Sequence, residues 1–392
     1  MFKKGVYAFL LSLCFLPPLG FGETKEQEIF AYDKAGNVGV NPLSPGSGNV
    51  QREVLDLQTF GNSPVEFKRL YRSRHRNFGV KTWELGAANT WHHNWSWEIR
   101  DLNYKENGFF NIRLNTPEGE TIDFKATDDT GMIRAPGLSR GERLYQWKPS
   151  GEQNNGHTLV TPEGWEYYFT RTDHPRYALI GVRDPDGQMW ELEYDNQDRL
   201  IKIQNRFGRS IALEREEING QERISKITSS DGREVVYDYD TFNNETVLKN
   251  VTYSGGEKAN YTYVGGESLI EGRPLLATAD DPMLEGAGSR MRWVYNYDPK
   301  FGAGREYMVI GMAKEERNLV TDELVVSLPL GAGSESWVEE GDGTGFYRKF
   351  FNGKLVEKVD GEGRWEKLFY SQGGHGYVNK RLFPNGAEIN YE

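Results

Sequence analysis

The chain has 392 residues, of which 37% are hydrophobic and 13% aromatic, with 45 glycines and a formal net charge of −11. Many glycines beside abundant tyrosine and tryptophan are typical of an all-β protein with many turns. The acidic balance argues against a nucleic-acid-binding surface.

The N-terminus has the pattern of a secretory signal peptide. Lys3 and Lys4 precede an apolar run from Val6 to Leu16, and Gly20–Gly22 fits a small-residue cleavage site. We therefore predict a signal peptide over residues 1–22 and a mature chain that is extracellular or lies in the periplasm or cell envelope. Because prolines interrupt the apolar run, we expect no membrane span after cleavage.

The single cysteine, Cys14, lies within this segment. The run Leu11–Cys14 imperfectly resembles a lipoprotein box, but Leu13 is large for the position before the cysteine, so a plain cleaved signal is favoured. The mature chain then holds no cysteine, which excludes a disulfide and a thiol nucleophile.

Residues 23–181 are expected to form an N-terminal β domain that begins with a polar arm. Alternation of apolar and polar residues starts at Val50 and predicts two strands joined by a turn at Gly61–Asn62. The second strand holds Phe67, Arg69 and Tyr71. Its basic residues are interpreted as a solvated strand edge and turn; they are Lys68, Arg69, Arg72, Arg74 and Arg76.

Four tryptophans follow: Trp83, Trp91, Trp95 and Trp97. Alternate spacing places the last two on one face of a strand, and the favoured interpretation is an aromatic core. The alternative is a carbohydrate-binding face, since indole rings stack on sugar C–H surfaces. His92 and His93 are adjacent, point to opposite faces of a strand and so cannot chelate one metal ion together.

Residues 182–264 contain internal repeats. Gly187, Gly208, Gly232 and Gly256 are spaced 21, 24 and 24 residues apart. After each glycine comes a run of period two rich in tyrosine, valine and isoleucine, which predicts a turn and then a strand with one buried face. A hairpin of about 20 residues cannot bury its apolar face alone, so neighbouring hairpins must stack.

We therefore predict an all-β fold of stacked antiparallel β-hairpin repeats that form a curved, partial β-shell sheet. Residues 265–340 are interpreted as degenerate repeats with long loops, with strand candidates at Trp293–Tyr297, Met308–Ile310 and Leu324–Val326. Repeats resume over residues 341–392, with turns at Gly363 and Gly386. The array ends mid-repeat, so the strand near Tyr391 is expected to leave an open sheet edge that favours self-association or a protein partner.

The repeat phrase resembles a known family. Tyr194-Asp195 followed by Arg199-Leu200 is similar to the YD repeat of Rhs-type proteins, and Arg69-Leu-Tyr-Arg-Ser73 resembles part of the domain that precedes such repeats. The residues that the resemblance marks as structural are Arg69, Tyr71, Ser73, Gly187, Tyr194, Asp195, Arg199, Gly208, Gly232, Tyr239 and Asp240.

No catalytic motif, cofactor motif or metal-ligand spacing was found, and the recurring aspartates are interpreted as turn formers. The leading hypothesis is thus a secreted, non-enzymatic structural or interaction protein, with no cofactor, metal or catalytic residue. The first alternative is a surface protein that binds cell-surface carbohydrate through Trp83, Trp91, Trp95 and Trp97. The second alternative is the N-terminal shell part of a larger Rhs-type toxin. In such toxins the resemblance implies self-cleavage at an Asp-Pro motif, which Asp298-Pro299 echoes only loosely.

Overall fold

A computed structural model provides the structure of the chain. It describes residues 50–73, 83–86, 91–106, 109–117, 121–126, 132–134, 143–147, 156–161, 163–172, 176–264, 274–282, 289–293, 313–327, 335–340, 345–351, 354–370 and 378–391. The predicted signal peptide, the predicted polar arm, the Asp298-Pro299 echo and the strand candidate at Met308–Ile310 lie outside these residues, as does Trp293–Tyr297 beyond its first residue.

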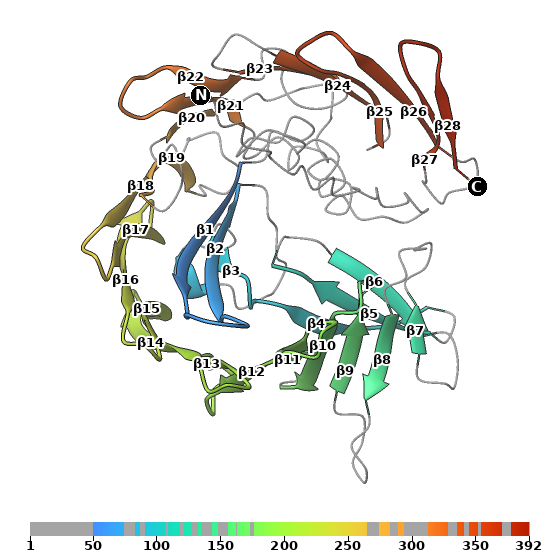
Figure 1. The fold of residues 1–392 in the computed structure, drawn as a ribbon. Coiled ribbons are helices and arrows are strands. Elements are labelled where there is room, and N and C mark those ends of the chain that lie inside the picture. Colours follow the sequence, from blue (N-terminus) through green and yellow to red (C-terminus); the bar gives the residue numbers. More distant parts are fainter. Residues whose placement is uncertain are drawn as a thin grey trace, which may run out of the picture.

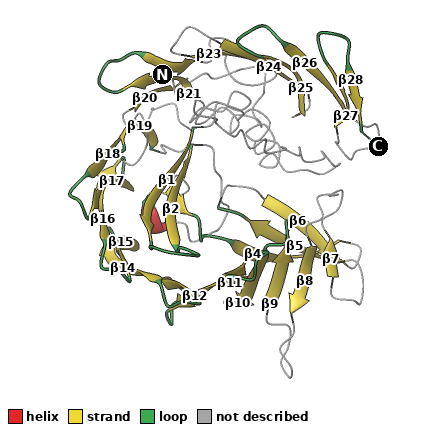
Figure 2. Ribbon diagram, viewed as in Figure 1, coloured by secondary structure: helices red, strands yellow, loops and turns green. Residues whose placement is uncertain are grey.

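The described chain is almost entirely β structure, as predicted. A single short 3-10 helix, η1 (Trp83–Leu85), is the one helix in the described ranges. Within them no helix is long and apolar enough to cross a membrane. Antiparallel strands form two sheets, which confirms the predicted sheet of stacked hairpins (Figure 2).

The first sheet, called the inner sheet here, has three antiparallel strands: β1 (Gln51–Gln58), β2 (Glu66–Arg72) and β3 (Trp91–His93). Its first strand has a β-bulge at Asp56, where the register shifts between Leu55 and Leu57. A bulge adds one residue to a strand and re-aims its side chains. Asp56 and Leu57 are consequently both buried, although adjacent residues of a regular strand face opposite sides.

The second sheet, called the outer sheet, runs from β4 to β28, and each strand pairs with the next along the chain. Its first part comprises β4 (Glu98–Glu106), β5 (Phe109–Asn115), β6 (Thr121–Ala126), β7 (Met132–Arg134), β8 (Arg143–Trp147), β9 (Gly156–Val160), β10 (Glu166–Arg171) and β11 (Arg176–Arg183). The first repeats form β12 (Met189–Tyr194), β13 (Leu200–Asn205), β14 (Ser210–Ile218), β15 (Gln221–Ser229), β16 (Glu234–Phe242), β17 (Glu245–Tyr253) and β18 (Lys258–Val264).

The remaining strands continue the same sheet. They are β19 (Leu275–Asp280), β20 (Ser289–Trp293), β21 (Ala313–Asn318), β22 (Leu324–Ser327), β23 (Glu335–Glu340), β24 (Gly345–Phe351), β25 (Lys354–Val359), β26 (Trp365–Tyr370), β27 (Val378–Leu382) and β28 (Glu388–Asn390). The predicted strand at Leu324–Val326 corresponds to β22.

Strand β11 joins the N-terminal part of the outer sheet to the repeats. One edge of β11 pairs with β10, while its other edge pairs first with β4, through Arg176–Ala178, and then with β12, through Gly181–Arg183. The pairings from β4 to β11 therefore return to β4 before the repeats begin.

The inner sheet lies in the concavity of the curved outer sheet (Figure 1). In the repeats, buried and exposed residues alternate: Val235 and Tyr237 are buried, whereas Glu234, Val236 and Asp238 are exposed. One hydrophobic cluster contains buried residues of both sheets, and a second, smaller one contains Leu355 and Leu368 of the outer sheet. The inner sheet thus supplies the apolar surface that the concave face of the repeats requires.

The turn glycines adopt the conformation that their spacing predicted. Gly187, Gly208, Gly232 and Gly256 all have positive φ, at 79°, 78°, 87° and 90°. In the third repeat, Gly232 N–H donates to the Ser229 carbonyl at 2.9 Å, so the glycine closes a tight turn.

Replacing Gly232 with valine should destabilise the chain by about 1–3 kcal/mol, because a β-branched residue resists positive φ. No other atom lies within 4 Å of the position of an added Cβ, so the loss would report backbone strain rather than a clash. Urea unfolding followed by circular dichroism measures it. Gly232→Asn is the control and should lose less stability, since asparagine tolerates this conformation. Equal stability of Gly232→Val and wild type would contradict the structural role of Gly232 in this turn.

Candidate functional site: the contact between the inner and outer sheets

The inner and outer sheets are joined by a buried polar cluster, called the anchoring cluster here. It consists of Asp56 and Arg69 from the inner sheet and Tyr237, Tyr253, Tyr261 and Asp281 from the outer sheet or the residue after β19. Arg69 and Asp56 have side chains that are 0% exposed, and Arg69 Nε donates to Asp56 Oδ2 at 2.5 Å. Arg69 was predicted on a solvated edge, which is wrong for this residue, because β2 turns it toward the concave face of the outer sheet.

Every nitrogen of the Arg69 guanidinium has an acceptor. Nη1 donates to the Tyr261 hydroxyl at 3.0 Å and Nη2 donates to the Tyr253 hydroxyl at 3.1 Å. The Asp56 carboxylate accepts from the hydroxyls of Tyr237, at 2.8 Å, and Tyr253, at 3.1 Å, in addition to Arg69. Buried charges persist where they are paired and hydrogen-bonded, and this pair meets both conditions.

The electrostatics of the cluster keep Arg69 charged and its tyrosines neutral. Burial alone would lower the pKa of Arg69, but Asp56, Tyr261, Tyr253 and Asp281 together outweigh it and raise that pKa well above its usual value. Burial also raises the pKa of Tyr237 and of Tyr261 well above the usual tyrosine value. The tyrosines therefore remain hydroxyl donors at physiological pH.

The other two residues of the Arg-x-Tyr-x-Ser phrase also hold the inner sheet in place. The Tyr71 hydroxyl accepts a hydrogen bond from the Leu276 backbone N–H of β19 at 3.0 Å. Ser73 Oγ accepts from the Val50 N–H at 2.9 Å, and the Ser73 N–H donates to the Val50 carbonyl at 3.0 Å. Arg69 and Tyr71 thus connect the two sheets, whereas Ser73 closes the inner sheet itself.

Side chains of the repeats also hold the turn between β1 and β2. Trp190 Nε1 donates to the Pro64 carbonyl at 3.0 Å, Asn205 Nδ2 to the Ser63 carbonyl at 2.6 Å, and Arg209 Nη1 to the Asn62 carbonyl at 2.6 Å. The β12–β13 hairpin and the turn that follows it therefore bind three successive residues of one inner turn. The inner sheet is fixed at its tip as well as at its centre.

The repeat tyrosines share one contact. Each lies seven residues after a turn glycine, follows a register shift in its strand, and donates its hydroxyl to the backbone carbonyl 15 residues earlier. The pairs are Tyr194–Leu179 at 2.6 Å, Tyr239–Ile224 at 2.6 Å, Tyr263–Leu248 at 2.7 Å and Tyr370–Leu355 at 2.7 Å.

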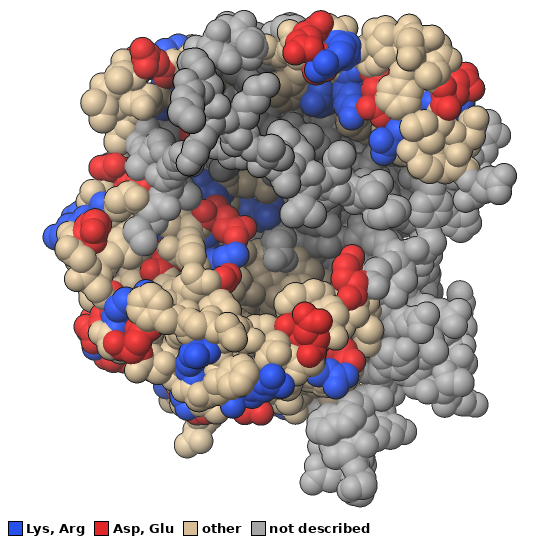
Figure 3. All heavy atoms as spheres, viewed as in Figure 1, with Lys and Arg blue, Asp and Glu red and all other residues tan. Residues whose placement is uncertain are grey.

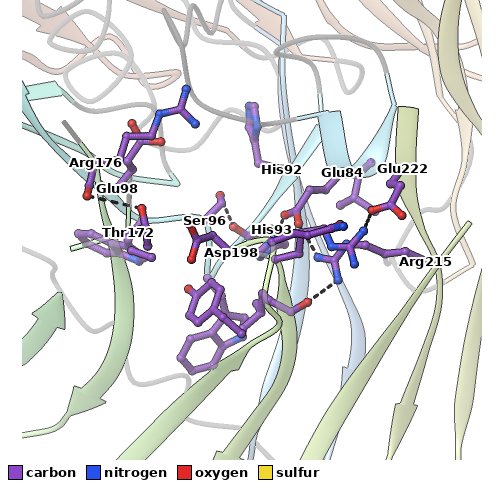
Figure 4. A pocket seen from close by; sticks show the side chains of 18 of the residues that line it. Glu84, His92, His93, Ser96, Glu98, Thr172, Arg176, Asp198, Arg215 and Glu222 are labelled. Atoms are coloured by element: carbon purple, nitrogen blue, oxygen red, sulfur yellow. Dashed lines mark hydrogen bonds and ion pairs between the residues drawn. The ribbon is translucent and has the colours of Figure 1, made fainter. Parts of the chain in front are cut away.

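Arg215 occupies this position in the second repeat instead of a tyrosine. Its Nη1 donates to the Leu200 carbonyl, again 15 residues earlier, and its Nη2 donates to Glu84 of η1. The same carboxylate lies 2.7 Å from His93 Nε2 (Figure 4). A departure from the repeat thus marks the residue that reaches the inner segment.

The ion pair at Glu84 should make stability depend on pH. Burial raises the pKa of Glu84, but the hydrogen bonds and charges of His93 and Arg215 lower it more, to about 2 from an unperturbed 4.5. Because the folded-state pKa is lowered, the stabilisation is present above pH 4.5 and is lost as pH falls from 4.5 to about 2. Urea unfolding at several pH values should show a steeper loss in wild type than in Glu84→Gln.

The exposed Glu217→Gln variant is the control and should follow the wild-type pH profile. If the free energy of unfolding fell equally with pH in Glu84→Gln and wild type between pH 4.5 and about 2, the ion pair at Glu84 would not be the source of the pH dependence.

The two Tyr-Asp phrases differ: Asp195 serves a turn, whereas Asp240, predicted in a turn, lies within β16 and pairs with Val247 of β17. Asp195 Oδ1 accepts from the backbone N–H groups of Gln197, at 2.9 Å, and Arg199, at 3.1 Å, and Arg199 Nε donates to Asp195 Oδ2 at 2.6 Å. Asp240 Oδ1 accepts from the Thr241 N–H at 2.8 Å, and Lys249 lies 2.9 Å from Asp240. The Asp195 carboxylate is thus occupied by turn contacts, and the Asp240 carboxylate by contacts within β16 and with β17.

The tryptophans have different surroundings. Trp91 is 1% exposed, and Trp95 is 9% exposed with its Nε1 donating to the Glu66 carbonyl at 2.7 Å. Trp97 is half-buried, and its ring centroid lies 4.4 Å from that of Tyr167. Trp83 belongs to η1. The burial of Trp91 and Trp95 agrees with the core interpretation, although Trp91, Trp95 and Trp97 all also line a cavity.

This cavity has a volume of about 530 Å³ and lies between η1, β3 and β4 on one side and β11 to β15 on the other. Figure 4 shows Glu84 and Arg215 on one wall and Glu98, Thr172 and Arg176 on the opposite wall. Sequence reasoning named Trp91, Trp95 and Trp97 on one wall as candidate ligand-binding residues. It missed the opposite wall, because that wall comes from segments more than 70 residues further along the chain. Among the described residues no group of three or more His, Cys, Asp or Glu side chains is placed to hold a metal ion.

Acidic and basic side chains of the described residues are interspersed on the face shown in Figure 3, so the described part of this face has no large region of one charge. Cross-strand ion pairs account for part of the pattern, such as Lys202–Glu193 at 3.0 Å and Lys226–Glu214 at 2.8 Å. Exposed pairs of this kind contribute little stability and are screened by salt.

Comparison with known families finds two matches. A domain of unknown function, DUF6531, matches residues 40–124, and the RHS repeat matches residues 178–210. The first covers the inner sheet and the second covers most of β11, all of β12 and β13, and the first residue of β14. No curated protein sequence matches the chain.

Three solved structures illustrate the structural likeness. TcdB2-TccC3-Cdc42 is 12% identical with a TM-score of 0.40, and the match covers 86% of this chain and 22% of that one. TcdB2-TccC3 is 11% identical with a TM-score of 0.40, and the match covers 99% of this chain and 21% of that one. The Tc holotoxin pore of Photorhabdus luminescens is 11% identical with a TM-score of 0.31, and the match covers 87% of this chain and 18% of that one. The chain spans about a fifth of the length of these solved chains.

Proposed function

We propose that this chain, which is an Rhs-repeat protein, acts outside the cytoplasm as a non-enzymatic scaffold, a curved partial β shell at the cell envelope or surface. The anchoring cluster carries the proposal. Its acid, base and hydroxyl groups, which in an open cleft would suit catalysis, are buried and bonded to one another. Groups so placed hold the two sheets together and are closed off from a substrate by their burial.

The extracytoplasmic part of the proposal is supported by the N-terminal sequence, and processing of the chain tests it. Expressed in bacteria with its own N-terminus, the chain should lose residues 1–22 and begin at Glu23, in the periplasm or the medium. N-terminal sequencing of fractionated cells measures this. A chain that keeps Met1 and stays in the cytoplasm would contradict it.

A scaffold of this kind would bind a protein partner or a second copy of itself through its last strands. Figure 1 shows β28 at the end of the outer arc, where Phe369, Ile389 and Tyr391 are 44%, 45% and 41% exposed. Exposed apolar side chains beside a terminal strand favour strand addition. Light scattering at micromolar concentration should show association that Ile389→Lys reduces, and a stable monomer for both proteins would exclude self-association.

Carbohydrate binding is a second candidate function, favoured by the cavity that Trp95 and Trp97 line. A glycan array probed with the purified chain tests it, with Trp97→Ala as the comparison. Loss of a bound glycan in the variant would support this candidate, and the absence of any bound glycan would remove it.

The chain as the N-terminal shell part of a larger toxin is the remaining alternative, and it stays a prediction from the sequence. The reading frame downstream of residue 392 tests it. Further repeats followed by a toxin domain would favour this alternative over an independent scaffold.

A further inference from the structure

The cavity between η1, β3 and the outer sheet has the composition of a sugar site. Trp95 and Trp97 line it beside Thr172, Gln197 and Gln221, which offer donors and acceptors to hydroxyl groups. Its volume of about 530 Å³ lies within the range of small-molecule sites. Flat indole walls with a few polar groups suit a pyranose ring, whose C–H face is apolar and whose edge is polar.

The charges around the cavity are mostly paired within the protein. Glu84 binds Arg215, Glu222 binds Arg199, and Glu98 binds Arg100. These acids each have a cation, and those arginines each have a carboxylate.

Arg223, at the start of β15, differs from these arginines. It lines the cavity and is 2% exposed. Its Nη1 donates to the Glu222 carbonyl at 3.3 Å and its Nη2 to Gln221 Oε1, while its buried Nε has no hydrogen-bond partner. Among the contacts of the described residues, none joins Arg223 to a carboxylate. Burial lowers its pKa more than the charges of Tyr239 and Glu245 raise it, as expected for a desolvated cation to which no carboxylate is hydrogen-bonded among the described contacts.

We propose that the cavity binds an acidic sugar of the hexuronate type, with its carboxylate on Arg223 and its ring against Trp95 and Trp97. The inference rests on the second proposed function, carbohydrate binding, and adds the charge class of the ligand. A guanidinium binds carboxylate through directed, charge-assisted hydrogen bonds, so the ligand supplies a hydrogen-bonded carboxylate that Glu245, which acts on Arg223 only through its charge, does not provide. A neutral sugar would leave the guanidinium without such a bond.

Isothermal titration calorimetry of the purified chain tests the proposal with three probes: glucuronate, glucose and acetate. Glucuronate should bind, and glucose and acetate should each bind at least about tenfold more weakly, since each lacks one of the two contacts. Arg223→Gln should reduce glucuronate affinity by a similar factor. Arg348→Gln is the matched control and should bind as wild type does, because Arg348 is equally buried, at 6% exposed, but lines a separate cavity.

Each other result has a defined meaning. Equal binding of glucose and glucuronate, with Arg223→Gln unchanged, overturns the acidic-sugar inference and leaves carbohydrate binding standing. Acetate that binds as tightly as glucuronate means an adventitious carboxylate only and overturns the inference. No binding of any probe overturns it as well. If circular dichroism shows that Arg223→Gln is unfolded, Arg223→Lys replaces it: weaker glucuronate binding supports the proposal and unchanged binding overturns it.

Discussion

Replacing Arg69 with methionine should destabilise the chain by about 3–5 kcal/mol, because the change leaves buried acids without their cation. Asp56 would lose its bond from Nε, and Asp281, whose carboxylate lies 4.0 Å from Arg69 Nη2, would lose the nearby charge. Methionine roughly fills the volume of the arginine stem, so the loss would be mainly electrostatic. Urea unfolding followed by tryptophan fluorescence measures it.

An exposed ion pair provides the matched control for this prediction. Arg183 pairs with Glu166, but its side chain is 47% exposed, so Arg183→Met should change stability by no more than about 1 kcal/mol. The double variant Arg69→Met with Asp56→Asn should recover part of the loss, since it removes one orphaned charge. A loss below about 1 kcal/mol for Arg69→Met would show that the cluster does not hold the sheets together.

The anchoring cluster explains why the two sheets should unfold together. Its hydrogen bonds between the two sheets join residues 181 to 197 positions apart in the chain, such as Tyr237 with Asp56 and Tyr253 with Asp56. Ordering such distant segments costs chain entropy that only the completed contact repays. Neither sheet therefore has its full set of buried partners without the other.

The repeats could be predicted because their signals are local. A glycine with positive φ, a capping aspartate and a strand of period two all lie within about ten residues, and Gly232 and Asp195 adopt the roles that their patterns predict. The two-residue turn at Asn219–Gly220, with φ of 53° and 73°, is a further local signal that the glycine spacing alone passes over.

The site could not be predicted because it depends on contacts that sequence spacing does not encode. Arg69 has the pattern of a half-exposed strand residue, and only the placement of β2 inside the outer sheet buries it. The bulge that turns Asp56 toward Arg69 has no glycine to mark it. Arg215 was visible as a departure from the tyrosine at that repeat position, and such departures are worth seeking where a repeat array must contact something else.

Replacing Trp91 with alanine should cost about 3–5 kcal/mol, the usual loss for a large buried aromatic. Trp91 is 1% exposed, with ring centroids of Tyr71 and Tyr261 at 5.1 and 5.0 Å and the Arg69 guanidinium carbon 5.0 Å from its own ring centroid. Its Nε1 donates to the Tyr263 hydroxyl at 3.0 Å, and that hydroxyl donates to the Leu248 carbonyl at 2.7 Å. Thermal and urea unfolding measure the loss.

Two further variants separate the contributions within this prediction. Trp91→Phe keeps an aromatic ring but removes the donor to Tyr263, so it should lose less than Trp91→Ala. Trp165→Ala removes a half-buried indole whose ring centroid lies 6.1 Å from that of Trp190. It should reduce the free energy of unfolding by less than either Arg69→Met or Trp91→Ala does. If Trp91→Ala were instead as stable as wild type, the indole would not be a core residue, and its face would be free for the ligand that the cavity holds.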